Sequence, residues 1–191
     1  AEKDLIVKEL GDKQDELVVG TLAREDAKTY YVDLGKTFGL LPKDEIIPGE
    51  KLEMGSQVKA YVSKLEIGTK GVFILLSRTH YGFLKRLLEI EIPEINEGII
   101  LVYSVARDAG NRTKIAVYSE NPNVDPVGAC IGERGSRISR IIDELNGEKI
   151  DVVPYDADDA RFIENALSPA RNLHVFVTDD KKKEALVVVD N

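Results

Sequence analysis

The stretch from Ile131 to Ile138 reads IGERGSRI and carries two glycines, Gly132 and Gly135, separated by two residues. Glycine lacks a side chain, so backbone N–H groups at such a turn can approach a phosphate closely. A helix that follows the turn presents the positive end of its dipole to the same phosphate. The spacing alone says little, because 15 glycines in 191 residues give about one such pair by chance. The context, a short helix before the turn and a longer one after it, predicts a nucleic-acid contact at Ile131, Gly132, Glu133, Arg134, Gly135 and Ile138.

Three arginines follow at helical spacing, Arg134, Arg137 and Arg140, which places them on one helical face. Guanidinium groups there can bind phosphate. The alternative is a solvated face whose arginines pair with Asp143 and Glu144. Beside a glycine turn we favour phosphate contact for Arg134 and Arg137, with Arg140 further along the same face.

Enzymatic chemistry is not indicated by the sequence. The two histidines lie far apart, at 80 and 174, and no HExxH, GxSxG or GxGxxG motif occurs. The single cysteine, Cys130, excludes an internal disulfide and a CxxC metal site, and we expect it to be buried on a short apolar helix. The prediction is a protein that is not an enzyme and that needs no cofactor or metal.

Composition narrows the nature of any nucleic-acid site. The chain is 43% hydrophobic and 31% charged, typical of a globular protein, and its net charge is −8. Such a charge argues against coating of nucleic acid by bulk electrostatics, so a site must be a small local patch. Apolar runs are too short for a membrane span. No leader sequence is visible, and a first residue other than Met leads us to expect a fragment or a processed product.

The first 80 residues predict a short helix and then five strands. Residues 1–10 can form an amphipathic turn or two with Leu5, Ile6 and Leu10 on one side, and a short strand is the alternative. Alternating apolar residues and glycine-containing turns give five short strands with a longer connection after the third, which predicts a small closed barrel of the OB type. The predicted strands are 17–22, 30–34, 38–42, 57–66 and 72–77.

Aromatic residues on these strands could stack on bases. Alternation puts Tyr30 and Tyr31 on opposite faces, so one of them is predicted to be core. Phe38 and Phe73 are predicted to be core residues rather than a stacking platform.

The remaining residues alternate helices and hairpins. Arg107, Arg112 and Lys114 flank the first hairpin and are expected at an exposed turn. The order helix, strand, strand recurs after residue 156 and indicates a weak internal repeat. The predicted elements are a helix at 81–91, strands at 99–107 and 112–119, helices at 126–131 and 136–145, a strand at 149–155, a helix at 160–167, and strands at 172–178 and 184–189.

Several segments resemble known families. The barrel segments resemble the S1 RNA-binding repeat, and PVGACIGERGSR resembles a type II KH module. The linking stretches LSRTHYGFLKRLLEIEIPEI, SVARDAGNRTKIAVYS, DPVGACIG, GEKIDVV and NALSPA closely resemble the NusA family of bacterial transcription factors. The S1-like segments are Val19-Gly20-Thr21, YVDLG at 31–35, GLLP at 39–42, GSQV at 55–58 and LLS at 75–77.

The resemblance implies an α+β multidomain protein in which a five-stranded OB-type barrel precedes type II KH modules. It implies an upstream tail at 1–14, an S1 domain at 15–79, a first KH domain at 80–155 and the first half of a second at 156–191. The implied function is binding of nascent single-stranded RNA, with effects on pausing, termination and antitermination. Implied partners are RNA polymerase, through an N-terminal domain missing here, and other elongation or antitermination factors. We expect a cytoplasmic monomer without membrane contact.

Departures from the family patterns lead to two further expectations. On the barrel, Tyr31 keeps a ligand-position aromatic, whereas Lys28 stands where a second aromatic is common, Pro42 replaces a typical His and Phe73 a typical basic residue. We therefore expect the barrel, with Tyr31 and Lys28 as its RNA contacts, to bind more weakly than the KH module. Glu133 inside the glycine turn should weaken phosphate binding there.

Two alternative functions remain at this point. One is a structural subunit of an RNA-degrading complex, which also runs S1 then KH, although the hairpin before residue 126 disfavours its KH topology. The other is a phosphorolytic RNA nuclease, which the module order and the lack of an acidic cluster disfavour.

Overall fold

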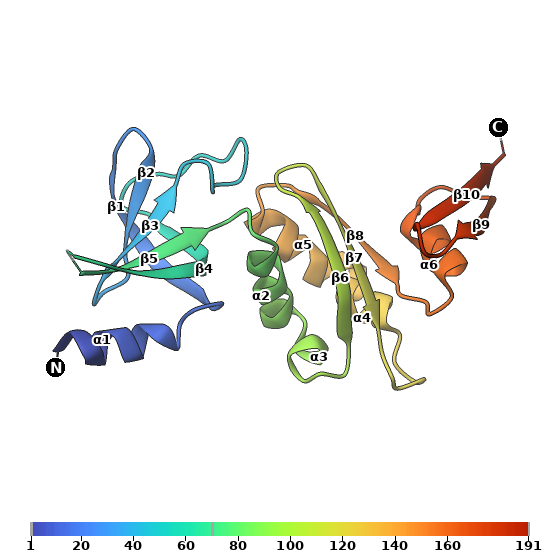
Figure 1. Ribbon diagram of the computed structural model, residues 1–191, viewed down its shortest axis with the longest axis horizontal. Coiled ribbons are helices and arrows are strands. Elements are labelled where there is room, and N and C mark those ends of the chain that lie inside the picture. The colour runs from blue at the N-terminus through green and yellow to red at the C-terminus, as the bar shows by residue number, and fades with distance from the viewer. Residues whose placement is uncertain (1, 70, 191) are drawn as a thin grey trace. The chain divides into compact units, whose positions relative to one another are not determined.

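The computed structural model describes residues 2–69 and 71–190. It divides into two compact units (Figure 1). The first comprises residues 1–90 together with 144–147, and the second comprises residues 91–143 and 148–191. Each unit has its own hydrophobic interior and is described by itself below.

A closed barrel of five strands forms the centre of the first unit, in the order β1-β2-β3-β5-β4 (Figure 1). Pairing of β1 with β4, with Val18 opposite Ala60, closes the barrel. β3 and β5 run parallel, and the other neighbouring pairs are antiparallel. The strands are β1 (Leu17–Glu25), β2 (Thr29–Asp33), β3 (Phe38–Pro42), β4 (Gln57–Gly68) and β5 (Gly71–Ser77).

Alternate residues of these strands fill the barrel, because successive side chains of a strand point to opposite faces. The buried members are Leu22, Val32, Leu41, Val58, Ala60, Val62, Ile74 and Leu76. Helix α1 (Glu2–Gly11) adds Leu10 to this cluster, but Leu5 is 65% exposed. Placing Leu5 beside Leu10 was wrong, because five positions on a helix correspond to about 140° of rotation.

The prediction that Phe38 and Phe73 belong to the core was also wrong. Gly39 and Leu41 are the residues of β3 that face inward, so Phe38 points outward and is 52% exposed. On β5 Ile74 and Leu76 belong to the barrel core, which leaves Phe73 half-buried on the outside. Tyr30 packs against the barrel core while its neighbour Tyr31 does not, as predicted for an alternating pair.

The end of the barrel leads into helix α2 (Tyr81–Glu91), which buries Phe83, Leu84, Leu87 and Leu88. Just before it, Arg78 is almost fully buried and donates two hydrogen bonds to Glu50, of 2.9 and 3.0 Å. The same guanidinium donates to the Lys59 carbonyl and to Glu144. A buried arginine needs such complete pairing, because an unpaired charge inside a protein is costly.

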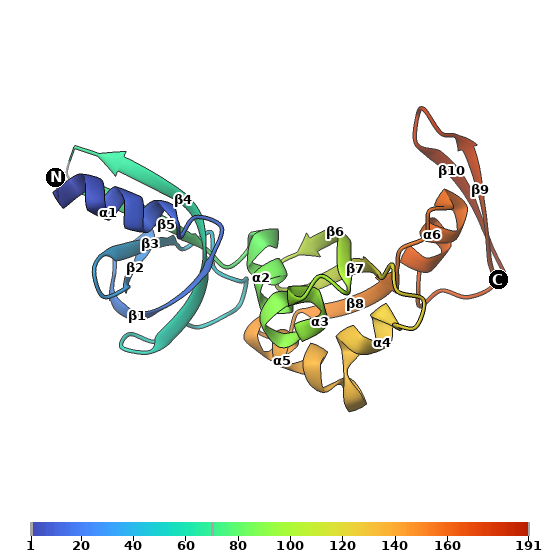
Figure 2. The same cartoon turned by 90° about the horizontal axis from the view of Figure 1, so that it is seen from below.

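The second unit contains a mixed sheet in the order β6-β7-β8. β6 and β7 form an antiparallel hairpin, and β8 runs parallel to β7. Figure 2 shows α4 and α5 along one face of this sheet. The elements are α3 (Pro93–Asn96), β6 (Leu101–Asp108), β7 (Arg112–Tyr118), α4 (Pro126–Ile131), a 3-10 turn (Glu133–Gly135), α5 (Ser136–Glu144) and β8 (Lys149–Pro154). Helix α3 was not predicted, although a proline commonly opens a helical turn as well as ending one.

Arg107 was expected at an exposed hairpin turn, and this expectation was wrong. Its side chain is 2% exposed and pairs with the fully buried Glu148, with 3.1 Å between Nε and Oε2. Glu148 also accepts hydrogen bonds from the Thr113 hydroxyl at 2.9 Å and the Gly110 amide at 2.8 Å. This network fastens the end of the hairpin to the start of β8. Arg112, in contrast, is exposed and pairs with Asp151.

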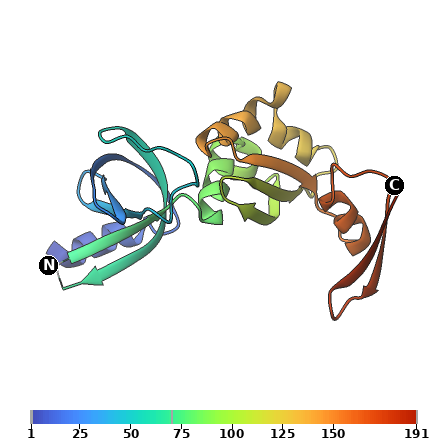
Figure 3. The ribbon, with the colours of Figure 1, turned by 90° about the horizontal axis from the view of Figure 1, so that it is seen from above.

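The last elements of the second unit are α6 (Asp159–Ala166) and the hairpin of β9 (Leu173–Asp179) and β10 (Glu184–Val189) (Figure 3). Phe162 of α6 packs edge-on against Tyr155 and Tyr103, whose rings stack 3.8 Å apart. The Lys114 ammonium donates to the carbonyls of Ala166 and Ser168 at the end of α6. These contacts hold α6 against the sheet formed by β6, β7 and β8.

Candidate nucleic-acid interface

The glycine turn between α4 and α5 has the backbone geometry that glycine alone adopts readily. Asp125 caps α4 by accepting from the Gly128 amide at 3.1 Å, with Pro126 in the first turn. The helix ends at Gly132, whose φ of 77° and ψ of 174° lie in a region essentially restricted to glycine. The Gly135 amide then donates to the Gly132 carbonyl at 3.1 Å, closing a tight turn. The local sequence therefore determines both the end of α4 and the direction in which α5 leaves.

The tip of the turn is exposed and carries one cation. Arg134 adopts a left-handed conformation, with φ 54° and ψ 29°, and its side chain is exposed, as is that of Glu133. Among the described residues, no carboxylate lies within ion-pair distance of Arg134. The turn thus offers a guanidinium beside backbone free of bulky side chains, with the Glu133 carboxylate next to it.

Arg137 and Arg140 are engaged by carboxylates of the same unit. The Arg137 guanidinium donates to Glu94 at 2.7 Å and to the Ala129 carbonyl at 2.8 Å. Arg140 lies 3.5 Å from the Glu91 carboxylate and remains largely exposed. The alternative considered from the sequence, ion pairs of these arginines with Asp143 and Glu144, is not what the structure shows. The pairing partners come from the segment around α3, which lies about 45 residues earlier in the chain.

Arg137 also supports the turn sterically. A Cβ placed on Gly132 would lie 2.8 Å from the Arg137 Cγ, so the arginine stem fills the space beside the glycine. The pKa of the nearby Glu94 carboxyl lies below its usual range, first because the carboxylate is hydrogen-bonded to its own backbone N–H and then because Arg137 donates to it. The ion pair is thus formed at neutral pH and keeps Arg137 in place.

The apolar residues predicted around the turn divide into one exposed and one buried. Ile131 is 37% exposed, whereas Ile138 lies on the buried face of α5. Cys130 is buried as expected, and burial raises the pKa of its thiol to about 11, which makes it unreactive at neutral pH. Of the two isoleucines predicted as contacts, Ile131 is the one whose side chain a ligand beside the turn can reach.

The barrel carries a second candidate surface, a pocket of about 510 Å³ on its outside. The Arg24 guanidinium lies over the Tyr31 ring, 4.0 Å from its centroid, and forms a cation–π contact. Lys28, which the sequence paired with Tyr31, is exposed on the adjoining turn but does not line the pocket. The lining residues are Ala23, Arg24, Tyr31, Phe38, Leu40 and Phe73. From the sequence, Phe38 and Phe73 were assigned to the core, because alternation separates the two faces of a strand without showing which face is inside the barrel.

Asp26 holds the Tyr31 ring in position. The Tyr31 hydroxyl donates to Asp26 at 2.8 Å, and this bond is the main reason that the pKa of Tyr31 is raised. The pKa of Asp26 is lowered, first by the backbone N–H of Lys28 and then by the Tyr31 hydroxyl. An aromatic ring fixed in this way can stack on a base without losing much conformational freedom.

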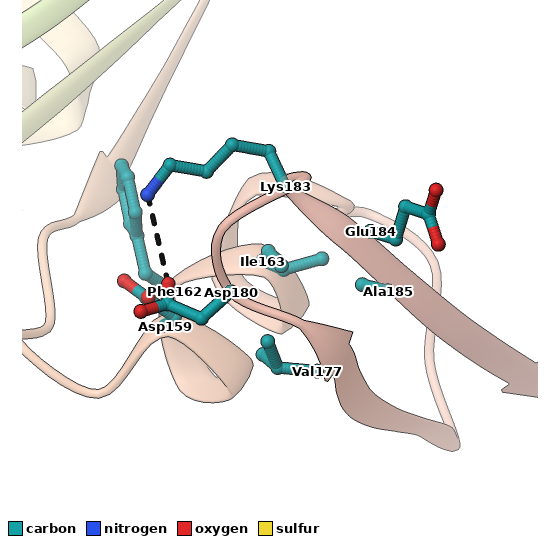
Figure 4. A pocket seen from close by; sticks show the side chains of 8 residues that line it. All are labelled: Asp159, Phe162, Ile163, Val177, Asp180, Lys183, Glu184 and Ala185. Atoms are coloured by element: carbon teal, nitrogen blue, oxygen red, sulfur yellow. Dashed lines mark ion pairs between the residues drawn. The ribbon is translucent and has the colours of Figure 1, made fainter.

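A smaller pocket of about 170 Å³ lies between α6 and the β9–β10 hairpin (Figure 4). Phe162, Ile163 and Val177 give it an apolar lining, and its cation, Lys183, lies 3.6 Å from Asp180 (Figure 4). With its one lysine so paired, this pocket presents fewer features of a nucleic-acid site than the other two.

Residues 2–69 and 71–190 contain no group of three or more His, Cys, Asp or Glu side chains placed to hold a metal ion. Within the same residues, no helix is both long and apolar enough to cross a membrane.

Comparison with known proteins relates this geometry to a family. Residues 78–155, which contain the hairpin, the glycine turn and β8, match the family model described as the NusA-like first KH domain. The chain is also 46% identical over 190 residues to the transcription termination/antitermination protein NusA of Halalkalibacterium halodurans. The chain is NusA-like. The NusA proteins of Bacillus subtilis and Thermus thermophilus are 45% and 41% identical to it, and they match 100% and 98% of the chain.

The similarity to NusA extends over both units but not over the whole of the relatives. The chain spans about half the length of these NusA proteins, namely 50% of the H. halodurans, 51% of the B. subtilis and 49% of the T. thermophilus protein. The activity of a full-length NusA is therefore only proposed for this chain.

Proposed function

We propose that this chain is the RNA-binding region of a transcription termination/antitermination factor and binds nascent single-stranded RNA. The observation that carries the proposal is the glycine turn at 132–135, with exposed Arg134 at its tip, inside the segment that matches the NusA-like first KH domain. In KH modules such a turn clamps the RNA backbone and leaves bases free to be contacted beside it.

The domain assignment follows from the same proposal. We assign residues 15–79 to an OB-type barrel of the S1 class, supported by the closed order β1-β2-β3-β5-β4. Residues 80–155 are assigned to a type II KH domain, supported by a helix and hairpin that precede the helix–turn–helix and the last strand. Residues 156–191 repeat the opening helix and hairpin and are assigned to the first half of a second KH domain. Residues 1–14 are a tail that precedes the barrel.

The binding mechanism uses the two surfaces differently. At the glycine turn, backbone N–H groups and Arg134 contact a phosphate while Ile131 contacts a base. Arg137 positions the turn, because its guanidinium is held by Glu94 and Ala129. On the barrel, bases stack on Tyr31, Phe38 and Phe73, and Arg24 supplies the cation.

The partners of the complete factor are part of this proposal. By similarity to NusA, a whole protein containing this region acts in the cytoplasm on RNA polymerase through a separate N-terminal domain, together with other elongation factors. Its effects on pausing, termination and antitermination follow from binding the emerging transcript and involve no enzymatic step. The alternative, a structural subunit of an RNA-degrading complex, is not favoured, because the matching relatives are named as termination/antitermination proteins.

Charge reversal at the turn tests the proposal. Arg134→Asp should weaken binding of single-stranded RNA at least tenfold, because it removes the cation and adds a repulsive charge at the turn. Lys181→Asp makes the same charge change on the exposed β9–β10 hairpin and serves as the control. Binding is measured by fluorescence anisotropy and folding by circular dichroism. Equal losses in both variants, or an unchanged affinity for Arg134→Asp, would reject the site.

Salt and strand selectivity test the same proposal independently. One to three phosphate contacts predict a slope of about −0.7 to −2 for log affinity against log salt. A slope steeper than about −5 would require a broad basic surface, which a chain of net charge −8 does not predict. Duplex RNA should compete poorly, because its bases are not available for stacking.

A further inference from the structure

A column of three aromatic rings lies where the barrel joins α2 and contains no residue of the two surfaces described above. The rings of Tyr61 and His80 stack with centroids 4.8 Å apart and an interplanar angle of 15°. His80 and Tyr81 continue the column at 4.6 Å and 27°. Tyr61 is buried at the inner end, whereas Tyr81 at the outer end is 55% exposed. Tyr81 is thus the ring of the column that solvent and a ligand can reach.

The surrounding residues fix the column rigidly. The Tyr61 hydroxyl donates to Asp15 at 2.7 Å, and burial, followed by this bond, raises the pKa of Tyr61 to about 12. His80 accepts the Gly82 amide on Nδ1 at 2.9 Å. A Cβ on Gly82 would lie 2.5 Å from the Tyr61 ring, so only glycine permits this close packing. The outermost ring, Tyr81, therefore stacks on a histidine ring whose own position is set by Tyr61 and by the Gly82 amide.

A pocket of about 300 Å³ opens beside this ring, and its two cations, Lys85 and Arg86, differ in their pairing with carboxylates. Arg86 is held by Glu89 at 2.8 Å and by the Asp15 carbonyl at 2.6 Å. The Lys85 ammonium lies over the Tyr81 ring, 6.0 Å from its centroid, in a long cation–π contact, and no carboxylate of the described residues lies within ion-pair distance of it. The lining residues are Asp15, Tyr61, Tyr81, Gly82, Lys85, Arg86 and Glu89. Lys85 is the cation of the pocket that remains available for an anion.

We propose that this pocket is a third contact for single-stranded RNA, in which a base stacks on Tyr81 and the adjacent phosphate binds Lys85. The inference rests on the proposed RNA-binding function and adds a site to it. A stacked aromatic ring next to an ammonium without a carboxylate partner among the described residues matches the two parts of a nucleotide, the flat base and the charged phosphate. Two carboxylates and two cations leave the pocket without net charge, so stacking contributes more of the affinity than charge does.

The test uses the whole chain and a long unstructured RNA that contains 5-iodouridine. Irradiation should crosslink this RNA to Tyr81, and mass spectrometry of the digested protein should locate the adduct. Tyr81→Ala should weaken binding at least about fivefold, the lower end of the range for loss of one base-stacking ring. Tyr81→Phe, which retains the ring, should bind like the original chain.

Salt separates the stacking contribution from the phosphate contact. The loss in Tyr81→Ala should be nearly the same at low and high salt, whereas Lys85→Ala should make the slope shallower by about 0.7. Phe176→Ala is the matched control, because Phe176 is an aromatic of similar exposure, 56%, on β9. It should leave the affinity unchanged.

The outcomes distinguish this inference from the function on which it rests. If Arg134→Asp abolishes binding while Tyr81→Ala binds normally and Tyr81 is not crosslinked, the proposed function stands and the third contact is rejected. If the original chain fails to bind single-stranded RNA, both are rejected. A Tyr81→Ala variant that loses its circular dichroism signal is replaced by Tyr81→Leu, which keeps apolar bulk without an aromatic face and should show the same fivefold loss.

Discussion

The Arg137 guanidinium bridges the Glu94 carboxylate and the Ala129 carbonyl, at 2.7 and 2.8 Å respectively. The side chain of Arg137, on the helix after the glycine turn, is thereby connected to α3 and to α4, the helix before the turn. This arrangement makes Arg137 a brace for the turn and leaves Arg134 as the cation facing outward. The competition between Glu94 and an RNA phosphate for Arg137 can be measured.

Replacing Glu94 by glutamine should release Arg137 for phosphate binding. We expect Glu94→Gln to bind single-stranded RNA more tightly at low salt, with the salt slope steeper by up to about 0.7 for the additional phosphate contact. The free energy of unfolding should fall by only about 0–1 kcal/mol, since the ion pair is partly exposed. Glu97→Gln removes the same charge one turn further on, from an exposed residue, and is the control. Identical slopes in the two variants would show that Arg137 stays on α3 and α4 regardless of Glu94.

The two glycines of the turn should differ in their tolerance of a side chain. Gly132→Ala places a Cβ 2.8 Å from the Arg137 Cγ at a backbone conformation that only glycine adopts readily, and should cost about 1–3 kcal/mol in the free energy of unfolding. Gly135 also has a positive φ, of 74°, but a Cβ placed on it would lie 3.8 Å from its nearest neighbour. Gly135→Ala should therefore cost about 1 kcal/mol in the free energy of unfolding. Urea denaturation measures both values. A Gly135→Ala variant less stable than Gly132→Ala would contradict this account of the turn.

The buried pair of Arg107 and Glu148 should be essential for the stability of the second unit. Glu148→Gln leaves the Arg107 charge without its buried counterion and should cost about 3–5 kcal/mol. Glu66→Gln removes the partner of an exposed pair with Lys64 and should cost about 0–1 kcal/mol. Thermal and urea unfolding compare the two. Similar small losses would mean that water reaches the Arg107 site.

Phe38 should affect RNA binding more than stability. Phe38→Ala removes an outward-facing ring from the barrel pocket, so the affinity for single-stranded RNA should fall by about 1–3 kcal/mol. Leu41→Ala, on the inward face of the same strand, should instead cost about 2–5 kcal/mol of stability. If Phe38→Ala destabilises the chain as much as Leu41→Ala does, the ring is a packing residue and not a stacking platform.

Local patterns predicted most of the elements. Helix α4, for example, begins at Pro126 behind the Asp125 cap and ends at Gly132, and β3 spans Phe38–Pro42, as the sequence indicates. These features depend on interactions between residues a few positions apart, such as caps, turns and the periodicities of helix and strand. The same locality explains why the glycine turn and its exposed Arg134 were recognisable without a structure.

Which charged and aromatic groups are available for a ligand depends on contacts between distant parts of the chain. Arg137 meets a glutamate 43 residues away, and Arg107 meets one 41 residues away, so neither pairing follows from helical spacing. Alternation placed Phe38 and Leu41 on opposite faces of β3, but closure of the barrel determined which of those faces is inside. Most helices and strands, though not α3, and the glycine turn were predictable from the sequence, because interactions between neighbouring residues and caps specify them. The tertiary structure decided which cations and rings remain free to bind, because that depends on partners brought together from distant parts of the chain.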